Sequence, residues 1–270
     1  MRETDKTFAG SIPEMYDSYI VPLLFEPYAA DLARRAAETS PKRVLETAAG
    51  TGVVTRALAP LLAPNAHYVA SDLNQPMLDR AASRQGPDGR IVWRRADALN
   101  LPFEDKTFDS VLCQFGAMFF PDRVAGYREA RRVLKPGGRF LFNVWDRIEE
   151  NEFAAVVTEV VGAMFPADPP RFLARTPHGY HDLNEIERDV RAAGFSDIAC
   201  VTLQERSAAP SARQAALAYC EGTPLRGEIE ARDPTRLKEA TARAMEAIAA
   251  AFGKGAVSGK IQAHVIAARA

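Results

Sequence analysis

The chain has 270 residues, of which 47% are hydrophobic and 26% are charged, a composition typical of globular proteins that fold in water. Its 34 Lys and Arg residues are matched by 35 Asp and Glu residues, so the net charge of −1 gives no reason to expect a nucleic-acid partner. The three cysteines have no metal-ligand spacing, and no apolar run reaches the length of a membrane span. We therefore expect a cytoplasmic protein with reduced thiols, no bound metal and no membrane span.

The first 40 residues are expected to form a helical segment before the first strand. Three prolines interrupt its early part, and residues 29–38 then carry apolar side chains at helical spacing. Aromatic residues are dense before this helix, among them Tyr16, which is followed by Asp17, and Tyr19. Such rings either pack the helix onto a sheet or cover a bound ligand, and both options stay open.

The stretch 44–55 is the strongest local signal for a binding site. An apolar pair that ends a buried strand is followed by Glu46, by a turn of small residues that includes Ala48, Gly50 and Gly52, and by the start of a helix. Small residues let a ligand approach the backbone amides, and glycine tolerates the positive φ angles that such loops need. The loop is therefore predicted to hold a nucleotide-like ligand, although a turn without a ligand would show the same pattern.

Three further strands are predicted after the helix that follows this loop. They cover residues 67–73, residues 91–98 and the apolar run that begins at Phe108. Asp72 lies near the end of the first of these strands, where a carboxylate can accept hydrogen bonds from both vicinal hydroxyls of a ribose. The alternative role for Asp72 is to cap the next helix, which Asn74 could also do.

The second half of the chain begins with a specific pattern and then becomes less informative. The stretch 132–145 predicts a helix end, a Pro-Gly-Gly turn and an alternating apolar strand. Beyond it, the sequence predicts helices at 151–165, 183–193 and across 211–252, and strands at 197–203 and 261–267.

The order of these motifs resembles that of the class I S-adenosylmethionine-dependent methyltransferases, especially the small-molecule branch related to ubiquinone and menaquinone biosynthesis. The resemblance rests on the acidic residue and small-residue loop, Asp72, Asp97 and the Leu-Lys-Pro-Gly-Gly stretch, and it covers residues 8–145 well. One departure is Ala48, which replaces the first glycine of the family's loop. The resemblance implies an α/β, Rossmann-like class I methyltransferase fold, with a mostly parallel seven-stranded sheet, helices on both faces and a helical cap or insertion.

The resemblance also implies that S-adenosyl-L-methionine is the cofactor and S-adenosyl-L-homocysteine the product. The implied cofactor-binding residues come from the N-terminal segment, the loop and the ends of the following strands: Tyr16, Glu46, Ala48, Gly50, Gly52, Asp72, Leu73, Met77, Asp97, Ala98, Gln114 and Phe115. The expected substrate pocket is aromatic and apolar: Tyr19, Met118, Phe119 and Tyr180.

A general base is optional in such an enzyme, because the methyl donor is already activated. If the acceptor is a hydroxyl or an acidic carbon, His178 or His181 could remove its proton. The alternative is that both are surface or packing residues. In the same half of the chain, Asp168-Pro169-Pro170 is similar to a motif of amino-methyltransferases but lies after the wrong strand, so we assign it no catalytic role.

The expected organisation has an N-terminal helical lid segment (1–40), a cofactor-binding core (41–147) and a remainder (148–270) with substrate-cap insertions at about 148–182 and 208–256. The second insertion would cover the site or, alternatively, form a homodimer interface.

The expected function is methyl transfer from S-adenosylmethionine to a small, apolar or aromatic molecule. The alternatives are a non-catalytic cofactor-binding scaffold and a nicotinamide-dependent dehydrogenase, which the bulky residues 53–55 disfavour because a dinucleotide loop needs a third small residue there. The sequence does not determine the acceptor or the atom that is methylated.

Overall fold

The computed structural model describes residues 12–270, so residues 1–11 of the expected lid segment lie outside the described part. The described chain divides into two compact units. The first, which we call the sheet unit, comprises residues 26–144, 180–203 and 263–270. The second, the helical unit, comprises the described residues up to Phe25 together with residues 145–179 and 204–262.

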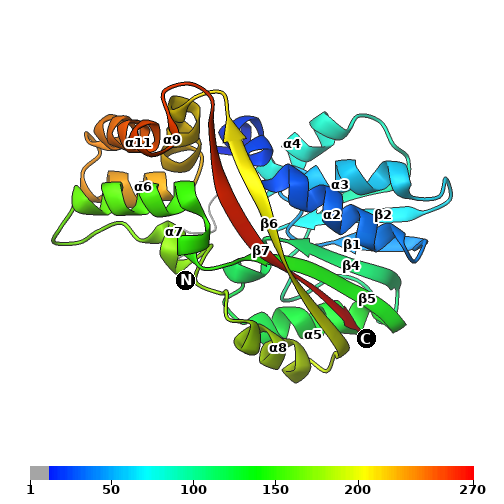
Figure 1. Cartoon of the computed structure of the whole chain (residues 1–270). Coiled ribbons are helices and arrows are strands. Elements are labelled where there is room, and N and C mark those ends of the chain that lie inside the picture. Colours follow the sequence, from blue (N-terminus) through cyan, green and yellow to red (C-terminus); the bar gives the residue numbers. More distant parts are fainter. Residues whose placement is uncertain (1–11) are drawn as a thin grey trace. The chain divides into compact units, whose positions relative to one another are not determined.

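Seven strands form one sheet in the order β3-β2-β1-β4-β5-β7-β6 (Figure 1). They are β1 (Arg43–Glu46), β2 (His67–Asp72), β3 (Ile91–Arg95), β4 (Phe108–Gln114), β5 (Leu134–Trp145), β6 (Ser196–Ala209) and β7 (Val257–Arg269). The first five strands pair in parallel, whereas β7 runs antiparallel to β5, because Gly137 bonds to Ala270 and Asp146 bonds to Gln262. The expected mostly parallel, seven-stranded sheet is confirmed.

Helices of the sheet unit cover both faces of the sheet, as expected (Figure 1). One face carries α2 (Glu26–Ala37), α3 (Val53–Leu58) and α4 (Gln75–Gln85), and the other carries α5 (Arg123–Val133) and α8 (Leu183–Ala192).

Strand β5 contributes apolar side chains to both faces of the sheet. Successive residues of a strand point to opposite sides of the sheet. Leu141 accordingly joins the apolar cluster that contains Leu32 of α2, while the rings of Phe140 and Phe142 pack against Tyr127 of α5.

Besides the 3-10 turn Ile148–Glu150, the helical unit contains seven helices among the described residues. They are α1 (Ile12–Met15), a π-helix (Tyr16–Phe25), α6 (Glu152–Ala163), α7 (Phe172–Arg175), α9 (Ala212–Glu221), α10 (Leu225–Arg232) and α11 (Leu237–Phe252). Helix α11 packs against α6 and α9, and the rings of Phe153 and Phe252 meet edge to face at 4.9 Å.

Several element boundaries differ from those expected from the sequence. Strands β6 and β7 extend beyond the expected 197–203 and 261–267. Their polar ends have no apolar pattern that would predict a strand, but they pair with each other, and Arg206 Nε donates to Ser258 Oγ there at 2.8 Å. Strand β3 ends at Arg95, three residues early, and the helical stretch expected across 211–252 is divided into three helices. Helix α2 begins at Glu26 and belongs to the sheet unit, whereas the sequence placed it in the lid segment.

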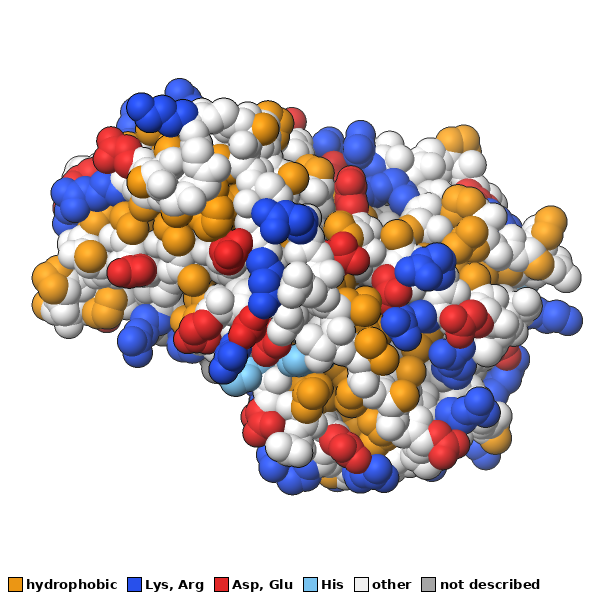
Figure 2. All heavy atoms as spheres, in the orientation of Figure 1, with side chains coloured by type: hydrophobic (Ala, Val, Ile, Leu, Met, Phe, Trp, Pro, Cys, Tyr) orange, Lys and Arg blue, Asp and Glu red, His pale blue; other side chains and the backbone are white. Residues whose placement is uncertain are grey.

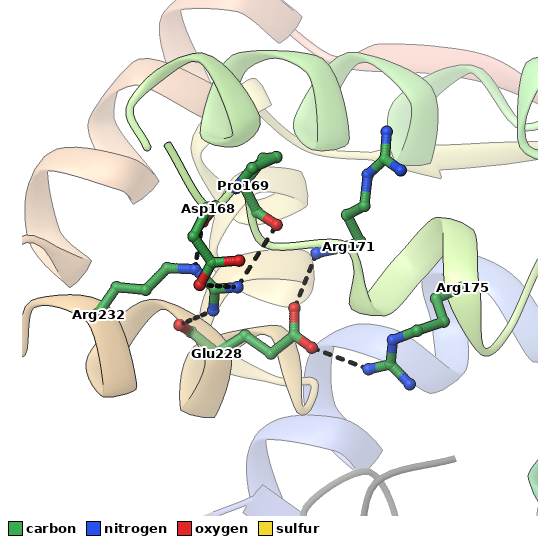
Figure 3. A pocket seen from close by; sticks show the side chains of 6 residues that line it. All are labelled: Asp168, Pro169, Arg171, Arg175, Glu228 and Arg232. Atoms are coloured by element: carbon green, nitrogen blue, oxygen red, sulfur yellow. Dashed lines mark hydrogen bonds and ion pairs between the residues drawn. The ribbon is translucent and has the colours of Figure 1, made fainter. Parts of the chain in front are cut away.

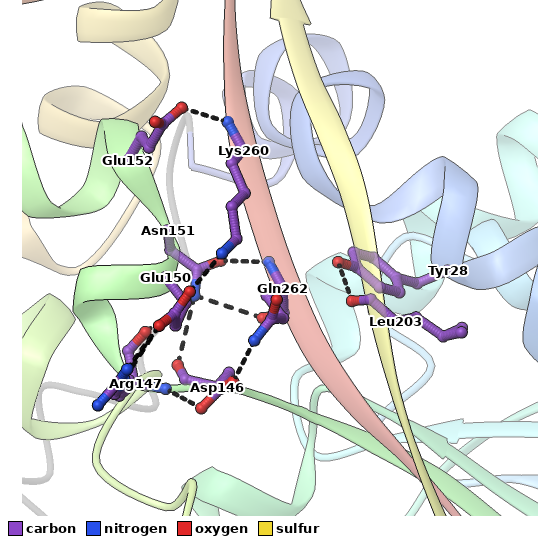
Figure 4. Close-up of polar contacts among 9 residues, drawn as sticks. All are labelled: Tyr28, Asp146, Arg147, Glu150, Asn151, Glu152, Leu203, Lys260 and Gln262. Carbon is purple, nitrogen blue, oxygen red and sulfur yellow. Dashed lines mark hydrogen bonds and ion pairs between the residues drawn. The ribbon is translucent and has the colours of Figure 1, made fainter.

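A hydrogen-bonded cluster in the helical unit joins the exit of β5 to β7 (Figure 4). Asn151 is buried at the start of α6, and its Nδ2 donates to the carbonyl oxygens of Asp146, Arg147 and Gln262, while its Oδ1 accepts from the Gln262 amide. The Asp146 carboxylate accepts from Gln262 Nε2 at 2.6 Å. These bonds fix the backbone around Asp146.

Charged side chains of both signs are interspersed over the face shown in Figure 2, in keeping with the near-zero net charge. None of the helices described here is both long and apolar enough to cross a membrane. Within residues 12–270, no cluster of His, Cys, Asp and Glu side chains is suited to a metal ion.

Candidate cofactor-binding site

The small-residue loop after β1 is tied to the carboxyl ends of two neighbouring strands. The Thr47 amide donates to the Leu112 carbonyl of β4 at 2.8 Å, and the Ala49 amide donates to the Ser71 carbonyl of β2 at 2.9 Å. The backbone enters the left-handed region at Ala48 (φ 51°), between these ties, and again at Gly50 (φ 55°), directly after them. The loop therefore has a fixed conformation at the edge of the sheet where parallel α/β folds bind ligands.

Ala48 fits in this loop because of a glycine that follows β4. A Cβ atom added to Gly116 would lie 2.4 Å from the Cβ of Ala48 and 2.8 Å from the Sγ of Cys113. Gly116 thus supplies the space that the Ala48 methyl group occupies. The replacement of the family's first glycine by Ala48 is therefore accommodated by Gly116, which is distant in sequence.

Asp72 connects the end of β2 to the loop. Its carboxylate is 8% exposed; Oδ2 accepts from the Gly50 amide at 2.9 Å and Oδ1 from the Asn74 amide at 2.8 Å. Burial raises the pKa of Asp72, against the lowering effect of these N–H donors. Oδ1 also accepts from Asn74 Nδ2 at 3.4 Å, whereas Oδ2 keeps a lone pair for a further donor. Because Asp72 bonds the loop and the cap residue itself, its contacts go beyond those of a simple helix cap.

The space beside Gly50 and Asp72 is open and partly apolar. A Cβ added to Gly50 would meet only Met77, at 3.8 Å, and the Leu73 side chain is 41% exposed. The Ala96 amide donates to the Asp72 carbonyl, which brings the exit of β3 to this place. Asp97 follows as an exposed turn residue whose Oδ1 accepts from the Leu99 amide, and Ala98 lies within that turn.

The end of β4 holds a strained residue. Phe115 has φ 49°, an uncommon value for a bulky residue, and its amide donates to both the carbonyl oxygen and the Oδ1 of fully buried Asn143, at 3.1 and 3.0 Å. Strain of this kind costs on the order of 1 kcal/mol and clusters at ligand sites. Gln114 precedes it at 8% exposure, and a 3-10 turn with buried Met118 and half-buried Phe119 follows.

Two residues at this site were not identified from the sequence. The Thr51 hydroxyl is buried in the loop and has no hydrogen-bond partner within the described structure, which fits a donor or acceptor for a bound ligand. Asn143 holds Phe115 in place. It could have been noticed in the sequence as a polar residue within an otherwise apolar strand.

Glu46 lies beneath the loop. It is 1% exposed, and its Oε2 accepts hydrogen bonds from Thr55 Oγ1 at 2.5 Å and from the Tyr68 hydroxyl at 2.6 Å. Burial raises the pKa of Glu46 to about 7, although both hydroxyls favour its charged form. Through Thr55 and Tyr68, Glu46 connects β1 to α3 and β2, and these contacts stabilise the base of the loop.

Three of the expected site residues belong to the helical unit, namely Tyr16, Tyr19 and His178. Within that unit a row of rings connects two of them: Tyr16 lies 5.5 Å from Phe25, Phe25 lies 5.9 Å from Trp145, and Trp145 lies 5.9 Å from His178.

The ring of His178 is held by the backbone of the cluster around Asp146. Its Nδ1 lies 2.8 Å from the Asp146 carbonyl oxygen, and the side chain is buried. Because a carbonyl only accepts, Nδ1 carries the proton in this contact, and Nε2 is the basic nitrogen of the neutral ring.

Tyr180 and His181 lie in the sheet unit. Tyr180 has no exposed surface: its hydroxyl bonds Asp189 at 3.0 Å and Tyr127 at 3.4 Å, and the Arg123 guanidinium lies 3.9 Å from its ring centre. It packs between α5 and α8, a placement that does not suit the expected substrate contact. His181, the next residue in the chain, is half-buried.

The helical unit also contains a cavity of 230 Å³ (Figure 3). It is lined by charged groups that already pair with one another. The buried Glu228 carboxylate accepts from Arg175 at 2.8 Å and from the amides of Arg171 and Phe172, and Arg232 pairs with Asp168 at 3.0 Å. We interpret these contacts as structural: they hold the loop that contains Asp168-Pro169-Pro170 against α10.

Comparison with known proteins identifies the family. A methyltransferase-domain family matches residues 45–142. The chain is 32% identical over 198 residues to a demethylmenaquinone methyltransferase of Clavibacter sepedonicus, covering 68% of this chain and 80% of that protein. The chain belongs to the class I S-adenosylmethionine-dependent methyltransferases.

Two further similarities agree with this assignment. A ubiquinone/menaquinone biosynthesis C-methyltransferase of Saccharophagus degradans is 30% identical over 166 residues, which cover 57% of this chain and 67% of the relative. The structure of Haemonchus contortus phosphoethanolamine N-methyltransferase 2 with S-adenosyl-L-methionine shares the fold, with a TM-score of 0.60 and 16% identity over 96% of this chain and 56% of that one.

The contact between Ala48 and Gly116 can be tested by a double-mutant cycle. We expect Gly116→Ala to lower the free energy of unfolding by about 1–3 kcal/mol, because the new methyl group overlaps that of Ala48. Adding Ala48→Gly should restore part of the loss, since the clash with Cys113 remains. Urea denaturation of the four proteins measures the coupling. Strictly additive changes would contradict the contact.

The burial of Glu46 predicts a pH dependence of stability. Its pKa is higher in the folded chain (about 7) than the ordinary value of 4.5, so the folded state binds the proton more tightly and stability falls as pH rises from 4.5 to about 7. Glu46→Gln keeps an acceptor for Thr55 and Tyr68 but does not titrate. We expect the stability of the variant relative to wild type to rise by on the order of 2 kcal/mol over this range. Urea denaturation at pH 5 and pH 8 measures this, and parallel pH profiles would refute it.

Proposed function

We propose that the loop after β1, Asp72 and the ends of β3 and β4 bind S-adenosylmethionine. The observation that carries this proposal is the pair of backbone hydrogen bonds that Asp72 accepts from Gly50 and Asn74, which places a carboxylate with a spare lone pair on Oδ2 directly beside an open loop of small residues. A ribose with two vicinal hydroxyls is the group that such a carboxylate recognises. S-adenosylmethionine supplies an electrophilic methyl group when bound.

The other residues of the site have roles that follow from their positions. Exposed Leu73 offers an apolar surface to the adenine ring, and Asp97 offers a carboxylate at its edge. Thr51 supplies a buried hydroxyl to the polar end of the cofactor. Gln114 and Phe115 at the end of β4, and Met118 and Phe119 in the turn that follows, would line the acceptor side of the site.

The acceptor is proposed to be a small molecule with an aromatic or quinone-like ring. The named relatives include demethylmenaquinone methyltransferases and a C-methyltransferase of quinone biosynthesis. Within the helical unit, the row of rings from Tyr16 to His178 agrees with such an acceptor. A cytoplasmic location and a homodimer stay predictions from the sequence.

We propose His178 as the general base. The Asp146 carbonyl holds its Nδ1 proton, so that Nε2 can take the proton that the acceptor loses when its oxygen or carbon bonds to the methyl group. His181 has no such partner on record in the described structure, which makes it the weaker candidate.

Cofactor binding is tested by Asp72→Asn. The variant retains an acceptor for the Gly50 amide but loses the charge and one acceptor oxygen, so we expect its affinity for S-adenosylhomocysteine to fall at least about tenfold. The control is Asp79→Asn on the exposed side of α4, whose carboxylate contacts only Gln75 among the recorded bonds. Titration calorimetry of each protein gives the affinities. Failure of the folded, ligand-free wild-type chain to bind would refute the proposal.

The base is tested by His178→Gln in an assay with labelled methyl donor and a set of phenolic and quinol acceptors. Loss of the base should lower kcat about 100-fold and remove the acidic limb of the pH profile of kcat. His181→Gln should keep both. An unchanged pH profile in His178→Gln would exclude the role, whereas a changed KM alone would indicate packing.

A further inference from the structure

A cavity of 390 Å³ opens in the sheet unit, at the edge opposite the cofactor loop. Its walls come from the amino-terminal ends of β1, β4 and β5, from the last residues of β7 and from the loop after α2. The small-residue loop and Asp72 lie at the carboxyl ends of the parallel strands. The two places are therefore separated by the length of the sheet, and the cavity is not a part of the proposed cofactor site.

Basic side chains predominate in this cavity. Four cations line it, namely Lys42, Lys135, Arg139 and Arg269, against one lining carboxylate, Asp109. Lys42 and Arg269 are exposed, and neither forms an ion pair within the described part of the chain. Several Lys and Arg side chains are visible in Figure 2 around this end of the sheet, near the position marked C in Figure 1.

The one lining carboxylate is already occupied. Asp109 Oδ1 accepts from Lys135 Nζ at 2.6 Å, and Oδ2 accepts from the backbone amides of Lys42 and Arg43 at 2.9 and 2.8 Å. Partial burial raises the pKa of Asp109, but these donors outweigh it, and the pKa is lowered overall. The carboxylate therefore stays ionised and fixes the backbone beneath Lys42, while it offsets the charge of Lys135 alone.

The remaining charges are only partly offset. Arg139 donates to the Arg35 carbonyl at 3.1 Å and lies 3.5 Å from the exposed Glu38 carboxylate. The oxygen of Ala270 accepts from the Gly137 amide at this edge. Even with the carboxylate of Glu38 counted, cations outnumber anionic side chains around the cavity.

The turn at 136–138 leaves room for a ligand between these charges. Gly137 has φ 76°, and a Cβ added there would meet nothing within 4 Å. The cavity volume falls in the range of small-molecule sites. Lysine acts as a point charge and arginine as a planar fork toward phosphate oxygens, and both are present.

We propose that this cavity binds a phosphate-bearing small molecule, with Lys42 and Arg269 as the cations that gain a partner. The site is independent of methyl transfer. Since binding to the folded state stabilises it, the ligand would also stabilise the sheet unit.

Sodium pyrophosphate is the probe for a calorimetric titration at constant ionic strength in a buffer without phosphate. We expect saturable binding with a dissociation constant below about 10 mM, weakened at least tenfold in the double variant Lys42→Ala/Arg269→Ala. The matched control is Lys238→Ala/Lys254→Ala, which removes two exposed cations from the helical unit and should bind as the wild type does.

Three results would overturn the proposal. The first is no saturable binding by the wild type. The second is an equal loss in the control variant, which would show unspecific attraction between opposite charges. The third is displacement of pyrophosphate by S-adenosylhomocysteine, which would place the anion in the cofactor site. Because the double variant should still bind S-adenosylhomocysteine, failure here is distinguishable from failure of the proposed function.

Discussion

The candidate site depends on the fixation of one small-residue loop at the carboxyl ends of parallel strands. Backbone bonds tie Thr47 to β4 and Ala49 to β2, and the Asp72 carboxylate holds the Gly50 amide. A loop with several positive φ angles has no regular hydrogen bonding of its own, so these ties decide its shape. They also leave the outward side of the loop open, which is the condition for a cofactor to approach the backbone.

The surroundings of this loop contain features that stability alone would not favour. Glu46 is a carboxyl group buried from solvent, Phe115 is held at a positive φ angle, and the Thr51 hydroxyl is buried without a partner among residues 12–270. Each costs free energy that the two apolar layers of the sheet unit must offset. Their concentration at one edge of the sheet agrees with a site shaped for a ligand.

The sequence predicted those parts of the fold and site that depend on neighbouring residues. The order of strands and helices follows from local apolar patterns, and the small-residue loop is visible as such. The role of Gly116 was not predictable, because it depends on the methyl group of Ala48, a residue 68 positions earlier that only the fold brings near. Tyr180 was expected in a substrate pocket. Its actual place between α5 and α8 depends on contacts with Tyr127 and Asp189, which no local sequence pattern reveals.

Binding at this loop is tested by a titration of the ¹⁵N-labelled protein with S-adenosylhomocysteine, followed by amide NMR. We expect saturable shifts for Gly50, Thr51, Leu73 and Phe115, because their amides surround the proposed cofactor site. The amide of Gly137, at the opposite edge of the sheet, should keep its position. Shifts confined to other parts of the chain, or none at all, would contradict the central claim that this loop and Asp72 hold the methyl donor.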